Sequence, residues 1–77
     1  MFLEIVTPDQ EIFSGDVSSA IFPGSNGSFG ILENHAPMVA TLKEGSLTIT
    51  ENGSDRSFEV NGGVLEVNHN KIIVLAD

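Results

Sequence analysis

The stretch SLTITENGSDRSFEVNGGVLEVNHNKIIVLA, residues 46–76, decides the fold class of this chain. Apolar and polar residues alternate in Leu47–Thr50 and again in Ser57–Val60, and a period of two is typical of β-strands with one buried face. Asn52-Gly53 lies between these segments, and this pair readily adopts the positive φ angles of a tight hairpin. The first part of the stretch is therefore predicted to be two antiparallel strands joined by a short turn.

The second part of the stretch extends this pair into a meander. VNHNK (Val67–Lys71) is expected to turn the chain between strands at Val64–Val67 and Ile72–Leu75. The last strand is apolar on both faces, which is typical of a strand buried between two layers. We therefore predict an antiparallel β-sandwich rather than an open single sheet.

Turn residues divide the rest of the chain into short pieces. They are Pro8, Gly15, Pro23-Gly24, Asn26-Gly27, Gly30, Pro37 and Gly45. Pieces of about five to eight residues suit strands better than helices. The expected fold is all-β without a substantial helix, in one domain over residues 1–77. All five phenylalanines lie in predicted strands and are expected in the core.

The segment HAPMVATLKEG (His35–Gly45) is the longest candidate for a helix. Pro37 would lie near the start of such a helix and Gly45 at its end. However, Val39 and Thr41 are β-branched, and the apolar residues of the segment also fit a period of two. We favour a strand here.

The charge of the chain restricts its partners. Three basic residues stand against eleven acidic ones, and no Lys or Arg precedes Lys43. The net charge of −8 argues against nucleic acid as a partner and against attachment to anionic lipid. No apolar run reaches the roughly 20 residues of a membrane helix, so direct insertion into lipid is not expected. The acidic field suits a partner with basic loops, although the same residues could serve solubility alone.

No motif indicates catalytic, metal or nucleotide chemistry. The serines lack the strand-to-helix turn of a nucleophile elbow, and neither His35 nor His69 has a second ligand at metal-binding spacing. PGSNGSFG (Pro23–Gly30) has the glycines of a phosphate loop but not its Lys-Ser/Thr ending or a following helix. We therefore expect no enzymatic activity, cofactor or metal. His69 is expected to be a solvated turn residue. His35 is expected to be either a structural residue that bonds main-chain groups at a corner or an interface residue.

Three segments together resemble the N-terminal domain of the epsilon subunits of F-type ATP synthases, called delta in mitochondria. They are TPDQEIFSGDV (Thr7–Val17), GSNGSFGILENHAPMVATLKEG (Gly24–Gly45) and GGVLEVNHNKIIVLAD (Gly62–Asp77). The resemblance covers nearly the whole chain. Its specificity rests on G-x-x-G-I-L-x-x-H-A-P, G-G-x-L-E-V and V-L-A-D occurring in this order and at this spacing.

The resemblance implies a β-sandwich of about ten strands with a mechanical, non-catalytic role. In this family the domain lies in the central stalk of a proton- or sodium-translocating synthase, where it joins the gamma subunit to the membrane-embedded c-ring. The expected partners are therefore gamma and the c-ring. The expected location is peripheral, on the cytoplasmic face of the bacterial inner membrane or the matrix or stromal side in an organelle. The alternative function is a free-standing small β-sandwich that binds another protein or a small ligand.

The resemblance also assigns contact positions. Thr7, His35 and Ala40 match positions that lie against gamma in the family. Ser28 matches a position that meets the c-ring and is often acidic in relatives; because it is neutral here, we expect Glu33 to supply the charge instead. Many family members continue into a C-terminal helical hairpin that inhibits ATP hydrolysis or binds ATP. This sequence ends at Asp77, so the hairpin is expected to be absent and neither property is assigned.

Overall fold

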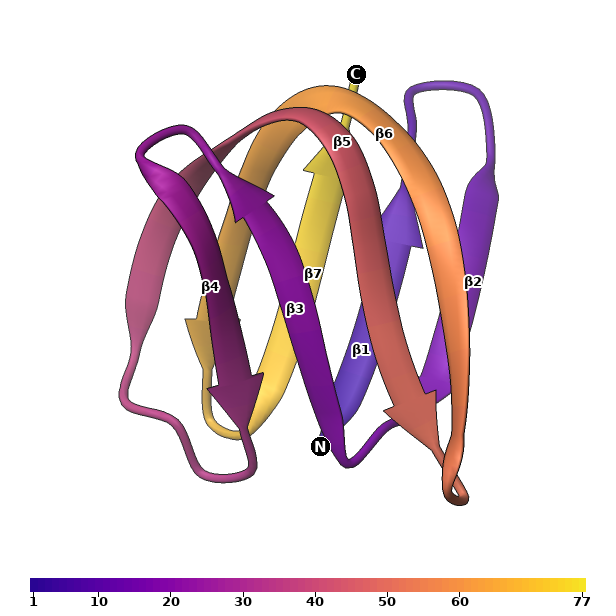
Figure 1. The fold of residues 1–77 in the computed structure, drawn as a ribbon, viewed down its shortest axis with the longest axis vertical. Helices are drawn as coiled ribbons and strands as arrows, with labels where there is room; N and C mark the ends of the chain where they lie inside the picture. Colours follow the sequence, from indigo (N-terminus) through magenta and orange to yellow (C-terminus); the bar gives the residue numbers. More distant parts are fainter.

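A computed structural model describes all 77 residues as strands and their connections, without a helix (Figure 1). The strands are β1 (Phe2–Val6), β2 (Glu11–Asp16), β3 (Ser19–Gly24), β4 (Gly27–Leu32), β5 (Met38–Glu51), β6 (Ser54–Asn68) and β7 (Lys71–Ala76). The predicted all-β class is confirmed. A helix was the alternative for His35–Gly45, but the segment is a strand from Met38 onward. Its β-branched residues and its period of two predicted this strand.

The seven strands form one sheet, in the order β2-β1-β7-β6-β5-β3-β4, that folds over on itself. The long strands β5 and β6 arch across the top of Figure 1 and belong to both layers. The first layer contains β2, β1, β7, Gly63–Asn68 of β6 and Met38–Leu42 of β5. The second layer contains the other halves of β5 and β6 together with β3 and β4. The predicted sandwich is therefore present, built from a single bent sheet.

The strand count is lower than the resemblance implies, because β5 and β6 each run through residues that were expected to separate strands. β6 bends at Gly62 and Gly63, whose φ angles of 117° and 141° are rarely adopted by residues with a side chain. A Cβ on Gly63 would lie 2.3 Å from the carbonyl oxygen of Leu75. The antiparallel prediction also needs one correction, since β1 and β7 pair in parallel.

Both hairpins of the opening stretch are confirmed. Asn52 and Gly53 have φ angles of 52° and 77° and join β5 to β6. His69 and Asn70, at 51° and 58°, join β6 to β7. Asparagine tolerates this left-handed conformation because its short side chain can bond locally. His69 is exposed in its turn, as predicted.

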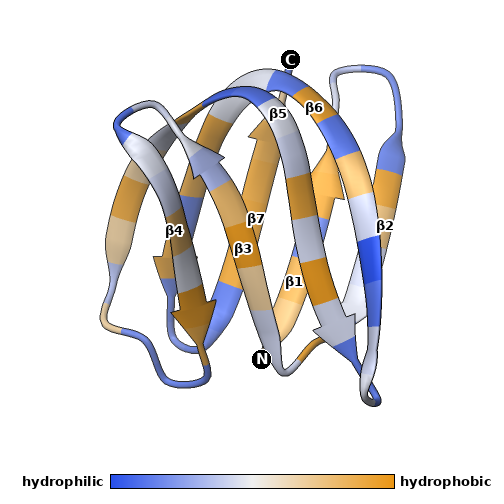
Figure 2. Ribbon diagram, in the orientation of Figure 1, coloured by the Kyte–Doolittle hydropathy of each residue, from blue (hydrophilic) through white to orange (hydrophobic).

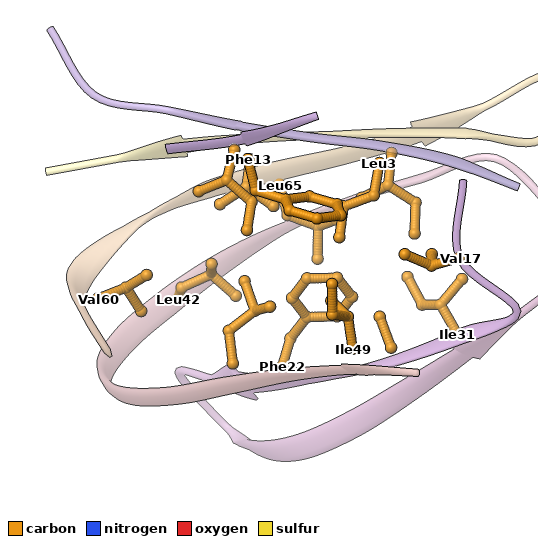
Figure 3. Packing of buried hydrophobic residues seen from close by; sticks show 14 of the residues in the cluster. Leu3, Phe13, Val17, Phe22, Ile31, Leu42, Ile49, Val60 and Leu65 are labelled. Carbon is orange, nitrogen blue, oxygen red and sulfur yellow. The ribbon is translucent and has the colours of Figure 1, made fainter. Parts of the chain in front are cut away.

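The core lies between the two layers and consists of apolar side chains alone. Figure 3 shows Leu3 and Leu65 from the first layer above Phe22 and Ile49 from the second. No polar or charged side chain is buried. Of the five phenylalanines, Phe13 and Phe22 are buried and Phe29 and Phe58 pack against the core. Phe2 differs, because it lies on the outer face of β1 and is 36% exposed.

The last strand, β7, is buried on one face only. Ile72 and Val74 lie in the core, whereas Ile73 is half-buried and Leu75 is 55% exposed. The prediction that both faces of β7 are buried within this chain is therefore wrong. The sandwich was correctly inferred, but the second apolar face of β7 points outward from the first layer, where no part of the chain covers it.

Candidate docking face

The outer face of the first layer carries a row of apolar side chains on adjacent strands. Val6 of β1 pairs with Leu75 of β7, and Leu75 pairs in turn with Val64 of β6, which is 41% exposed. Residues paired in this way have adjacent side chains on one face of a sheet. Figure 2 shows that β7 is hydrophobic over most of its length beyond Lys71.

A second row places acidic side chains beside this apolar row. Ile73 of β7 lies between Glu4 of β1 and Glu66 of β6, and Glu66 pairs with Val39 of β5, which is 69% exposed. The two rows form what we call the docking face. Its residues are Glu4, Val6, Val39, Val64, Glu66, Ile73 and Leu75. An uncovered apolar patch with a polar surround is typical of a protein interaction site.

The outer face of the second layer is chemically different. Thr48 and Ser57 share a hydrogen bond of 3.1 Å between their hydroxyls, and the Thr50 hydroxyl donates to Asp55 at 2.7 Å. Ile21 and Leu32 are the exposed large apolar side chains of this layer. Because most of its polar side chains already bond to one another, this face has fewer free hydrogen-bonding groups and less uncovered apolar surface for a partner than the docking face has.

All four surface hollows are lined in part by residues of the docking face. A hollow of about 360 Å³ lies beside the β1–β2 turn and contains Val6, Val64 and Leu75. A second hollow, of about 270 Å³, contains Glu66 and Ile73, and a third, of about 260 Å³, contains Val39 and Glu66. Hollows on an apolar surface can receive side chains of a partner, which favours this face as a binding surface.

The largest hollow, about 570 Å³, lies where β5 begins, and it brings together two residues predicted to contact different partners. Ser28 and Ala40 both line it. The exposed Ser28 lies at the start of β4, whereas Ala40 packs partly against the core. Ser25 and Thr41 close its rim, because the Thr41 hydroxyl donates to the Ser25 hydroxyl at 2.9 Å.

Thr7 organises the β1–β2 turn and lines the 360 Å³ hollow. Its hydroxyl accepts the main-chain N–H groups of Asp9 and Gln10 at 3.3 and 3.2 Å. The main-chain N–H of Thr7 donates to the carbonyl of Gln10 at 2.8 Å. The hydroxyl is thus already hydrogen-bonded within the turn. What Thr7 offers a partner is its location beside the docking face, in the same hollow as Val6, Val64 and Leu75.

His35 lies at the opposite end of the sandwich, in the exposed loop between β4 and β5. Its Nδ1 is 2.8 Å from the carbonyl oxygen of Ala36, so the histidine bonds the main chain locally. The loop is held in place through Asn34, the residue before His35, whose main-chain N–H donates to Asn70 Oδ1 at 2.7 Å. In the sequence Asn70 is recognisable only as a turn residue, because a side chain that bridges two distant turns leaves no local pattern.

Glu33 is not close to Ser28. Ser28 is the second residue of β4, which spans Gly27–Leu32, and Glu33 follows its last residue. Figure 1 shows that the two ends of β4 lie at opposite ends of the sandwich. Five residue steps along a strand correspond to about 16 Å. Glu33 Oε1 is instead 2.9 Å from the N-terminal ammonium of Met1, while the carboxylate side chain is 57% exposed. A single ring contact at one end of β4 therefore involves one of these two residues and not both.

The structure contains no group of three or more His, Cys, Asp or Glu side chains placed to hold a metal ion. It also has no helix that is long and apolar enough to cross a membrane.

Comparison with known proteins agrees with the fold. Residues 1–77 match the family described as the ATP synthase delta/epsilon chain, β-sandwich domain. The chain is 45% identical to the ATP synthase epsilon chain of Pelotomaculum thermopropionicum, over 97% of this chain and 56% of that protein. It is also 45% identical to the epsilon chain of Chlorobium limicola, over 97% of this chain and 86% of that protein.

A solved structure has the same fold. A chain in the OSCP/F1/c-ring assembly of the Euglena gracilis mitochondrial ATP synthase superposes with a TM-score of 0.89 at 23% identity. The superposition covers 96% of this chain and 48% of that one. The chain thus spans a little over half the length of several curated relatives and about half of this structural neighbour.

Proposed function

Because this chain belongs to the delta/epsilon β-sandwich family of ATP synthases, we propose that it is a non-catalytic subunit of the central stalk. In this role it couples the gamma subunit to the c-ring of a proton- or sodium-translocating synthase. It is then held at the membrane by its partners, on the cytoplasmic face in a bacterium or the matrix or stromal side in an organelle. Its curated relatives are epsilon chains, which supports the assignment.

We propose that the docking face binds gamma. The supporting observation is that the apolar outer face of β7 is uncovered while its inner face is fully in the core. A permanent interface between subunits is more apolar than the ordinary protein surface. Thr7 adjoins one end of this face and His35 lies at the other end of the sandwich, which fits contacts by both residues with one large partner.

The ring contact is proposed at the end of the sandwich that carries the β3–β4 turn. Ser28 is exposed there, on the same end as the β1–β2 turn (Figure 1). Glu33, at the other end, is already paired with the Met1 ammonium. The acidic chain suits ring loops with basic residues, because opposite charges favour encounter and orientation.

Titration of the 77-residue chain with the isolated gamma subunit of the same synthase tests the proposal. We expect a complex at micromolar concentration, a higher melting temperature, and slower amide exchange along β6 and β7 at the docking face. A chain that ignores gamma but whose melting temperature rises with a small molecule would instead be the free-standing binding module.

A further inference from the structure

The edge of β5 at Val39 carries main-chain groups without a partner strand. The main-chain N–H of Ser25 donates to the carbonyl of Thr41 at 3.0 Å, so the carbonyl of Thr41 points toward β3. In a strand, the main-chain groups of every second residue point to the same side. The N–H and C=O of Val39 therefore point to that side as well, away from β6.

No strand reaches this side of β5 before Leu42. The pairing of β3 with β5 runs from Ser19 to Gly24, and Gly24 pairs with Leu42. None of the six main-chain hydrogen bonds outside the strand ladders involves Val39. Its N–H and C=O consequently open into the 570 Å³ hollow, which Val39 itself lines.

Resting on the proposed function, we propose that this edge accepts an extended segment of the gamma subunit by strand addition. An exposed edge recognises an extended chain through main-chain hydrogen bonds, whatever the side chains. Val39 also belongs to the docking face, so a partner seated on that face comes directly up to the edge. The added strand and the docked face then form one continuous interface.

The hollow predicts the chemistry of the added segment. Met38–Ala40 is about 10 Å long, which is enough for three or four paired residues. Met38, Phe29 and Ala40 supply an apolar floor, while Ser25 and Thr41 supply hydroxyls, and no charged residue lines the hollow. The segment should therefore be uncharged, with apolar side chains on the side that faces this floor.

A second free edge is closed by side chains. The rings of Phe13 on β2 and Phe58 on β6 are 5.5 Å apart, and the Arg56 guanidinium lies 5.3 and 5.2 Å from their centres. A charged side chain over an edge is a common protection against the addition of strands. The edge at Val39 has no such cover.

Amide exchange of the unaltered chain, free and bound to gamma, tests this inference. We expect the Val39 amide to exchange rapidly in the free chain and to become at least about a hundredfold slower in the complex, because a formed main-chain hydrogen bond blocks exchange. Ser57 provides an internal control. The carbonyl of Thr50 accepts from Ser18 at 2.8 Å on the β3 side, and Thr48, the partner of Ser57, has the same orientation two residues earlier. The Ser57 N–H therefore points away from β5, to the side of β6 where no strand pairs with it. Its exchange should stay rapid.

Two variants separate main chain from side chain at this position. Val39→Pro removes the N–H while leaving the bonds that neighbouring Ala40 makes to β6, and proline is tolerated at strand edges. Val39→Thr keeps the main chain and the branched shape. Loss of one hydrogen bond corresponds to roughly fivefold to tenfold in affinity, so gamma should bind Val39→Pro more weakly than Val39→Thr by about that factor.

The outcomes distinguish this inference from the proposed function. If gamma binds and the Val39 amide exchanges as fast in the complex as in the free chain, the inference of strand addition is wrong, while the assignment of the docking face to gamma stands. Equal affinity of the two folded variants would lead to the same conclusion. If gamma does not bind the unaltered chain, the proposed function fails and the inference fails with it. If Val39→Pro does not fold, the exchange of the unaltered chain decides alone.

Discussion

Asn70 accepts a hydrogen bond of 2.7 Å at its Oδ1 from the main-chain N–H of Asn34, which lies 36 positions earlier in the chain. The main-chain carbonyl of Asn70 also accepts from the N–H of Phe2 at 3.2 Å. One residue therefore ties the β4–β5 loop and the start of β1 to the β6–β7 turn. This tie holds the loop that carries His35 at one end of the sandwich.

We predict that Asn70→Gly lowers the free energy of unfolding by about 1 kcal/mol, which is typical of one lost hydrogen bond. Glycine accepts the φ of 58°, so the change removes the side chain without straining the turn. Asn70→Asp, which keeps an acceptor oxygen, is the matched control and should lose less. Urea unfolding measures both, and exchange at the Asn34 amide should become faster in the glycine variant only. Equal losses in the two variants would assign the effect to the turn and not to the bond.

The bend of β6 makes a stronger prediction. Gly63→Ala should cost about 2–4 kcal/mol of unfolding free energy or prevent folding, because a Cβ would lie 2.3 Å from the Leu75 carbonyl oxygen at a φ of 141°. Gly30→Ala is the control, since its Cβ would meet nothing closer than 3.7 Å. Thermal and urea unfolding of the two variants give the comparison. A stable, normally folded Gly63→Ala chain would show that the bend does not depend on glycine.

Much of the fold was predictable because the signals are local. Alternation in Leu47–Thr50 and the pair Asn52-Gly53 identify strands and a turn without reference to the rest of the chain. The sequence did not reveal that β5 and β6 continue through their glycines, because a glycine that ends a strand and one that bends it have the same local pattern. Whether Gly62 and Gly63 end or bend a strand depends on the tertiary contact with Leu75.

The candidate site was predictable only in part. The apolar character of both faces of β7 was visible in the sequence, but burial by another layer of the same chain and burial by a partner leave the same pattern. Likewise, Ser28 and Glu33 are close in sequence, whereas an extended strand separates their positions. The free edge at Val39 is set by where β3 stops pairing, which no property of Val39 itself encodes.

The docking face itself is tested by a pair of equally exposed residues. Leu75 on the docking face is 55% exposed and Ile21 on the second layer is 53% exposed. Leu75→Glu should weaken the binding of gamma at least tenfold, because a carboxylate would have to be desolvated at the centre of the interface, a cost of at least about 1.4 kcal/mol. Ile21→Glu should leave the affinity unchanged. Both variants should retain the parent fold by circular dichroism. Weaker binding from Ile21→Glu alone would place gamma on the other layer.

The ring contact is tested by moving a charge between the two ends of β4. Ser28→Glu places a carboxylate at the end proposed to meet the ring, and it should raise the affinity for c-ring loops that carry basic residues and steepen the loss of affinity with salt. Glu33→Lys reverses a charge at the other end. We expect it to leave both the ring affinity and the salt dependence of that affinity unchanged. The Lys variant should also lose the contact with the Met1 ammonium, a part-buried pair whose carboxylate is 57% exposed and which is worth on the order of 1 kcal/mol. Association of each variant with detergent-solubilised ring, measured over a salt series, provides the comparison. A ring affinity that responds to Glu33→Lys and not to Ser28→Glu would move the ring contact to the His35 end of the sandwich.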